Sequence, residues 1–149
     1  MASKLQPDME RPNAYVLVVE DCPKACVSIR QALEHAGLHV SIAATPERGL
    51  ELAARELFDL ILLDLSSSTL RAVEFCQALR KESATRDTPI VFMVGWETSK
   101  ETLDQIRKIG AADVITKPFR TLDFLARVLG SLRYNPCQSL SVQDWLRNR

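Results

Sequence analysis

The chain has 149 residues, a length that suits one domain with short tails and that buries enough surface to form a core without disulfides or structural metals. Its 19 basic residues balance its 19 acidic residues, so it lacks the net positive charge that draws proteins to nucleic acids or anionic membranes. No apolar stretch approaches the length of a membrane span, and residues 1–13 lack the apolar core of a signal peptide. We therefore expect a cytoplasmic protein whose four cysteines are reduced thiols.

The predicted strands are short apolar runs. Residues 1–13 are polar and predict a flexible lead-in, after which apolar runs alternate with amphipathic segments. Continuous runs of Val, Ile and Leu are typical of strands that are buried on both faces of a parallel sheet. The predicted strands are Tyr15–Val19, His39–Ala43, Leu60–Leu63, Ile90–Val94 and Val114–Ile115.

Each segment between these runs, and the segment after the last, has helical periodicity and local start or end signals. Proline suits the first turn of a helix, Ser or Thr suits the N-cap, and glycine suits the residue after the last turn. Leu57 and Leu122 are expected on the buried faces of the second and the last helix. The signals are Pro23 and Gly37 for the first helix, Thr45 with Pro46 for the second, the stretch Leu70–Lys81 for the third, Thr98 with Glu101 and Gly110 for the fourth, and Thr121 for the fifth.

The alternation of strands and helices predicts an α/β fold. Five successive strand–helix units imply a doubly wound parallel sheet with right-handed crossovers and helices on both faces. In such sheets the ligand site lies outside the carboxyl ends of the strands. The residues that follow the strands are therefore the first candidates for a functional site.

Charged residues stand at the carboxyl ends of three predicted strands. Glu20 and Asp21 follow the first strand, Asp64 follows the third, and Lys117 follows the fifth. Clustered carboxylates repel one another unless a cation is present, and hard oxygen ligands on an open site suit Mg²⁺. Lys117 can meet a phosphoryl oxygen as a point donor. Each residue alone could instead cap a helix or form one ion pair, but the four together predict phosphoryl transfer onto a carboxylate.

These segments resemble the receiver domain of bacterial two-component response regulators. The resemblance rests on VLVVED, LILLD, PIVFMV and ITKPF, in that order, and it covers residues 14–133. It implies a five-stranded, flavodoxin-like sheet with strand order 2-1-3-4-5. Residues 134–149 would then be a C-terminal tail or a linker stub.

The resemblance also implies roles for the site residues. Asp64 would accept a phosphoryl group from the phosphohistidine of a sensor histidine kinase or a histidine phosphotransfer protein, and Lys117 would hold the product. The cofactor would be Mg²⁺, bound directly by Asp21 and Asp64, through water by Glu20, and by the backbone carbonyl of Ser66. The chain would be a signalling domain rather than an enzyme, with at most self-catalysed phosphotransfer and autodephosphorylation. The Lys117–Pro118 peptide bond is often cis in relatives.

The chain departs from the family at the two switch positions. The family usually has Thr or Ser at the end of strand four, where this chain has Val94, and Tyr or Phe in strand five, where this chain has Val114. A valine cannot donate the hydroxyl hydrogen bond that relatives use to sense the phosphoryl group. The usual proline and glycine after the acceptor aspartate are replaced by Ser68 and Ala72.

These departures keep two other functions open. The first is a pseudo-receiver, a protein–protein interaction module that signals without phosphorylation. The second is a phosphatase or a flavodoxin-like enzyme on the same topology. Ser66 stands where dehalogenase-type phosphatases need a second aspartate, and Glu-Asp-Cys-Pro-Lys replaces the phosphate loop of flavodoxins, so the enzyme reading has less support.

The expected partners follow from the resemblance. They are the phosphohistidine donor and a downstream protein target, with neither nucleic acid nor membrane bound by this chain alone. Homodimerisation stays open, as does the question whether the chain is one part of a larger protein.

Overall fold

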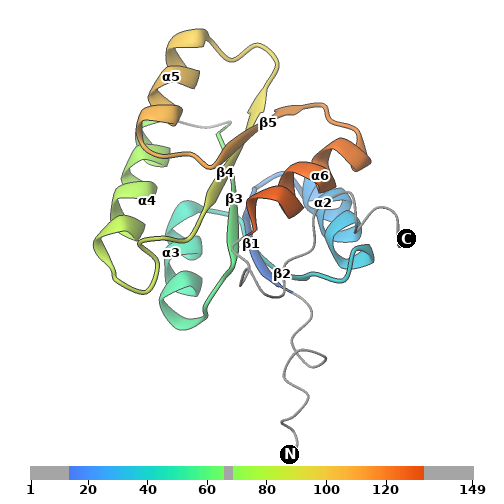
Figure 1. Cartoon of the computed structure of the whole chain (residues 1–149), viewed down its shortest axis with the longest axis horizontal. Coiled ribbons are helices and arrows are strands. Elements are labelled where there is room, and N and C mark those ends of the chain that lie inside the picture. Colours follow the sequence, from blue (N-terminus) through green and yellow to red (C-terminus); the bar gives the residue numbers. More distant parts are fainter. Residues whose placement is uncertain (1–13, 66–68, 133–149) are drawn as a thin grey trace, which may run out of the picture.

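The computed structural model describes residues 14–65 and 69–132, in which strands and helices alternate from end to end (Figure 1). Among these residues no helix is long and apolar enough to cross a membrane. The elements are β1 (Tyr15–Val19), α2 (Pro23–His35), β2 (His39–Ala43), α3 (Pro46–Arg55), β3 (Leu60–Asp64), α4 (Thr69–Lys81), β4 (Ile90–Gly95), α5 (Lys100–Lys108), β5 (Asp113–Lys117) and α6 (Thr121–Ser131).

The sheet has the predicted topology. Its five strands are parallel and lie in the order β2-β1-β3-β4-β5. Figure 1 shows α2 and α6 on one face of the sheet and α3, α4 and α5 on the other. The doubly wound α/β architecture is thereby confirmed. The fifth strand is longer than the predicted pair of residues, because it begins at Asp113 and continues to Lys117.

Two cores fill the spaces between the sheet and the helices. Alternate strand residues point to opposite faces, so Val18 and Leu62 pack toward α2 and α6, while Leu17 and Leu63 pack toward α3 and α4. All four side chains are fully or almost fully buried. This two-sided burial explains why the strands read as continuous apolar runs rather than as alternating ones.

The helix ends confirm some of the predicted signals and correct others. The Thr45 hydroxyl accepts the Arg48 N–H at 3.1 Å, and Gly37 and Gly110 have positive φ angles of 89° and 93°. The predicted cap at Thr98 is wrong, since the Ser99 hydroxyl accepts the Thr102 N–H at 3.1 Å and caps α5. A hydroxyl at either of two neighbouring positions can cap a helix, and the path of the loop decides between them.

Three further predictions at the helix termini are wrong. Thr121 is the first residue of α6 rather than its cap, and the N-cap Arg120 forms no side-chain capping bond. Leu57 lies beyond the end of α3 and is 72% exposed, and Leu122 is 65% exposed in the first turn of α6. Periodicity placed Leu57 on the apolar stripe of α3, but this helix ends at Arg55 and the extended Glu56 breaks the pattern. In α6 the buried residues begin at Phe124, after Leu122.

Gly49 allows α3 to approach the sheet closely. A Cβ atom at this position would lie 3.0 Å from Val19 Cγ2 and 3.2 Å from Phe75 Cε1. We expect Gly49→Val to lower the free energy of unfolding by about 1–3 kcal/mol, because the added methyl groups overpack this contact. Urea denaturation measures the change, and Ala54→Val at an exposed position of the same helix is the control, with an expected cost of about 0.5 kcal/mol. A Gly49→Val protein as stable as the control would contradict this packing.

Candidate functional site

The residues predicted for the site converge at the carboxyl edge of the sheet. Glu20 and Asp21 directly follow β1, and Asp64 ends the neighbouring strand β3. Val19 pairs with Leu63 in the parallel register, so the next residue of each strand, Glu20 and Asp64, reaches the same level. The three carboxylates each offer an oxygen, and these oxygens all lie within 4.8 Å of one another.

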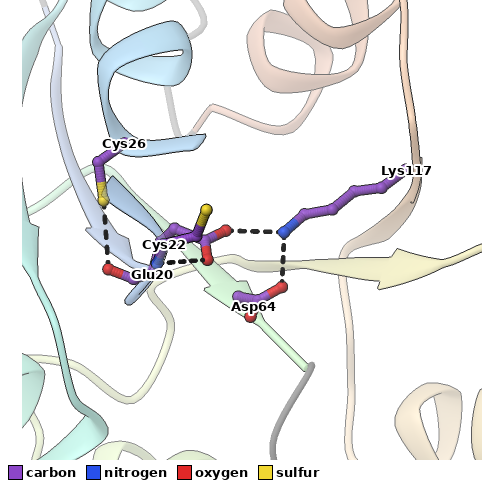
Figure 2. A network of polar contacts seen from close by, with 5 residues as sticks. All are labelled: Glu20, Cys22, Cys26, Asp64 and Lys117. Atoms are coloured by element: carbon purple, nitrogen blue, oxygen red, sulfur yellow. Dashed lines mark hydrogen bonds and ion pairs between the residues drawn. The ribbon is translucent and has the colours of Figure 1, made fainter. Parts of the chain in front are cut away.

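Lys117 joins two of these carboxylates. Its Nζ donates to Glu20 Oε1 at 2.7 Å and to Asp64 Oδ1 at 2.8 Å (Figure 2). The side chains of Glu20 and Asp64 are only 1% and 7% exposed, and that of Lys117 is 28% exposed. Burial by itself lowers the pKa of Lys117, but the hydrogen bonds and charges of Asp64 and Glu20 outweigh it and raise the pKa above the usual lysine value. The Lys117–Pro118 peptide bond is cis, as relatives led us to expect.

The two acids after β1 have different surroundings. Glu20 is buried, and its second carboxylate oxygen accepts the Cys22 N–H at 3.2 Å. Asp21 is exposed and lines a cavity of about 210 Å³ together with Asp64. Glu20 is therefore held by the protein itself, whereas Asp21 faces the open space.

The donor set fits a hard divalent cation. It consists of carboxylate oxygens on a site open to water, which is the environment that Mg²⁺ prefers. Glu20, Asp21 and Asp64 all line the cavity and could reach an ion there, and both carboxylate oxygens of Glu20 already accept hydrogen bonds, from Lys117 and from the Cys22 N–H. Ser66, the predicted fourth ligand, lies outside the described residues.

Two cysteines near the site, Cys22 and Cys26, form hydrogen bonds with Glu20. The Cys26 thiol donates to the Glu20 carbonyl at 3.3 Å, and Cys22 is the exposed N-cap residue of α2 (Figure 2). Cys76 lies in α4 and is buried in the core on that face of the sheet, and desolvation raises its pKa to about 11. These three cysteines are free thiols, as predicted.

Val94 and Val114 occupy the altered switch positions. Val94 is 2% exposed near the end of β4 and belongs to the core on the α3–α5 side. Val114 is half-buried on β5, beside Phe92 of β4. Neither side chain offers a hydrogen-bond donor, so neither can hydrogen-bond to a ligand on Asp64.

Two charged residues near the site were missed by the sequence reading. Arg71, in the first turn of α4, lines the same cavity as Asp21 and Asp64, and it pairs with Glu47 of α3. The available signal was its position in the first turn of the helix that follows β3. Glu97 places its carboxylate oxygens 2.5 and 2.6 Å from where a Cβ would stand on Gly95, so a side chain at that position would require the exposed Glu97 side chain to move.

Comparisons with known proteins agree with this fold. A family model described as the response regulator receiver domain matches residues 16–129. The uncharacterized transcriptional regulatory protein YkoG of Bacillus subtilis is 30% identical over 134 residues, which cover 90% of this chain and 58% of that protein. The response regulator ArlR of Staphylococcus saprophyticus is 34% identical over 127 residues, which cover 84% of this chain and 55% of that protein.

Solved structures give the same result. The chemotaxis protein CheY4 of Vibrio cholerae has a TM-score of 0.74 and 30% sequence identity, with 80% of this chain and 99% of that chain covered. The chain spans little more than half the length of the two curated relatives named above. Because the family model matches residues 16–129, which is most of the chain, the chain belongs to the receiver domains of two-component response regulators.

Proposed function

We propose that Asp64 accepts a phosphoryl group from a phosphohistidine and that the chain signals through the resulting aspartyl phosphate. The observation that supports this most is the bridge from Lys117 to both Asp64 and Glu20, with the exposed Asp21 beside it. This arrangement sets a nucleophile, a fixed cation and an open cation site within one small volume. The exposed Asp21 is not part of the Lys117 bridge, so a purely stabilising role of the cluster would not explain its position.

The transfer is an exchange of one bond to phosphorus for another. A carboxylate oxygen of Asp64 forms a bond to phosphorus as the phosphorus–nitrogen bond of the donor breaks. The electron pair of that bond leaves with the imidazole, which takes up a proton from water. Lys117, held 2.8 Å from Asp64 Oδ1, offsets negative charge on the phosphoryl oxygens.

Asp21 and Asp64 would hold the divalent cation at the cavity, while Glu20, buried and bonded to Lys117, orients the ammonium. When bound, Mg²⁺ supplies charge neutralisation and a fixed geometry for the phosphoryl oxygens. The donor protein would be a sensor histidine kinase or a phosphotransfer protein in the cytoplasm, and the output would be a downstream protein. The chain would act as a signalling domain that is modified and then reset.

The proposed transfer depends on Mg²⁺, and this dependence tests it. Wild-type protein incubated with acetyl phosphate and Mg²⁺ is expected to gain the mass of one phosphate, as read by intact mass spectrometry. Chelation of the cation with EDTA is expected to slow the reaction at least about 100-fold, since two anions must then approach without a neutralising charge. Absence of an adduct with acetyl phosphate and with a panel of histidine kinases would contradict the proposal.

A second candidate is the pseudo-receiver, which the buried Val94 favours because the usual hydroxyl is missing. In that case the chain binds its partner equally well with and without Asp64. Partner affinity of Asp64→Ala compared with wild type distinguishes the two functions. A large loss of partner affinity in Asp64→Ala would contradict the pseudo-receiver and support the receiver.

A further inference from the structure

We propose that Arg71 is a second phosphoryl-binding cation of this site, and that it exchanges Glu47 for the phosphoryl oxygens when Asp64 is modified. This inference rests on the proposed function of Asp64. It assigns to Arg71 the sensing role that a hydroxyl at the position of Val94 has in relatives.

The position of Arg71 supports this role. Arg71 lines the cavity of about 210 Å³ that also contains Asp64, Asp21 and Glu20. Lys117 lines a different cavity, together with Trp96 and Glu97 on the β4–β5 side of the sheet. The two cations therefore reach the end of β3 from different sides, and a group attached to Asp64 can contact both.

The ion pair between Arg71 and Glu47 can be exchanged for another. Nη2 of Arg71 donates to Glu47 Oε1 at 2.6 Å and to Oε2 at 2.7 Å. The side chains of Arg71 and Glu47 are 43% and 70% exposed. Exposed ion pairs of this kind contribute little net stability, so a stronger anion nearby can replace the carboxylate.

A phosphoryl group is such an anion. It presents up to two negative charges and three acceptor oxygens, whereas Glu47 presents one charge and two oxygens. The planar guanidinium matches phosphoryl oxygens in two parallel hydrogen bonds, a geometry that lysine cannot reproduce. Arg71 lies in the first turn of α4, so only its side chain and the start of that helix need to move.

The exchange would alter the contact between α3 and α4. These helices pack against each other on the same face of the sheet (Figure 1), and the Arg71–Glu47 pair connects their first turns. Loss of the pair frees Glu47 and draws the first turn of α4 toward Asp64. Phosphorylation would then change the surface formed by α3 and α4, which does not include the switch positions Val94 and Val114.

The test uses beryllofluoride with Mg²⁺ as the phosphoryl mimic, on the full chain. Arg71→Ala is expected to weaken beryllofluoride binding at least tenfold while leaving the affinity for Mg²⁺ alone within threefold. Glu47→Gln is expected to strengthen beryllofluoride binding, because it weakens the competing partner. Arg127→Ala is the matched control, since Arg127 also bonds both oxygens of one carboxylate, that of Asp113, at 3.0 Å each, away from the acceptor site.

An NMR measurement distinguishes direct contact of Arg71 with beryllofluoride from an indirect structural effect of the Arg71→Ala substitution. On saturation of the wild type with beryllofluoride, the side-chain Nε–Hε resonance of Arg71 is expected to shift, and that of Arg127 is expected to stay. Equal beryllofluoride affinities of wild type and Arg71→Ala, or an unchanged Arg71 resonance, would overturn the inference and leave the proposed function standing. Absence of both beryllofluoride binding and phosphorylation in the wild type would overturn the two together.

Discussion

Replacing Lys117 by methionine is expected to lower the free energy of unfolding at pH 7 by about 3 kcal/mol. Removal of one member of a buried ion pair costs about 3–5 kcal/mol, and the 28% exposure of Lys117 places the loss at the lower end of that range. The substitution leaves Glu20 and Asp64 buried without their shared cation. Urea denaturation measures the loss, and Lys100→Met, at an exposed position at the start of α5, is the control.

The pH dependence gives the same prediction a second readout. The pKa of Lys117 is raised in the folded protein, so its stabilising contribution is fully present below the usual lysine pKa of about 10.4 and is lost as the pH rises through the folded value. The stability difference between wild type and Lys117→Met is thus expected to be constant near neutral pH and to shrink in alkaline solution. Mg²⁺ is expected to stabilise Lys117→Met more than wild type, because it replaces the lost charge. If Lys117→Met lowers the free energy of unfolding at pH 7 by less than about 1 kcal/mol, the bridge is not buried as described.

Replacing Asp64 by asparagine is expected to reduce the phosphate adduct at least about 100-fold, since an amide is not a comparable nucleophile and removal of a nucleophile costs orders of magnitude. The fold should be retained, because the amide oxygen of asparagine can still accept the hydrogen bond that Lys117 now donates to Oδ1. Intact mass spectrometry with acetyl phosphate and Mg²⁺ measures the adduct. Thermal unfolding of the same samples confirms that the variant is folded.

The control for Asp64→Asn is Asp123→Asn, which changes the same charge at an exposed position of α6. It should gain phosphate at the wild-type rate. An Asp64→Asn protein that still gains one phosphate would identify another acceptor in the chain. Peptide mapping would then locate that acceptor, and the assignment of Asp64 would be wrong.

Much of the fold could be predicted because it depends on local chemistry. Val, Ile and Leu in unbroken runs are buried on both sides wherever they lie, so β1, β3 and β4 were recognisable without their neighbours. Pro23, Thr45 with Pro46, and Gly37 act on the backbone next to them, and the structure has each in its predicted place. Thr98 was misassigned because Ser99 beside it has the same chemistry. Only the three-dimensional path of the loop distinguishes the two hydroxyls.

The convergence of Glu20, Asp21, Asp64 and Lys117 was also determined by the sequence. Parallel strands bring their carboxyl ends to one edge, so residues far apart in the chain had to meet there. The tertiary structure decided how they meet. It buried Glu20 against Lys117, left Asp21 exposed, and set Arg71 beside the same cavity with Glu47 as its partner. These contacts depend on distances between separate helices and loops, and periodicity within one segment carries no information about such distances.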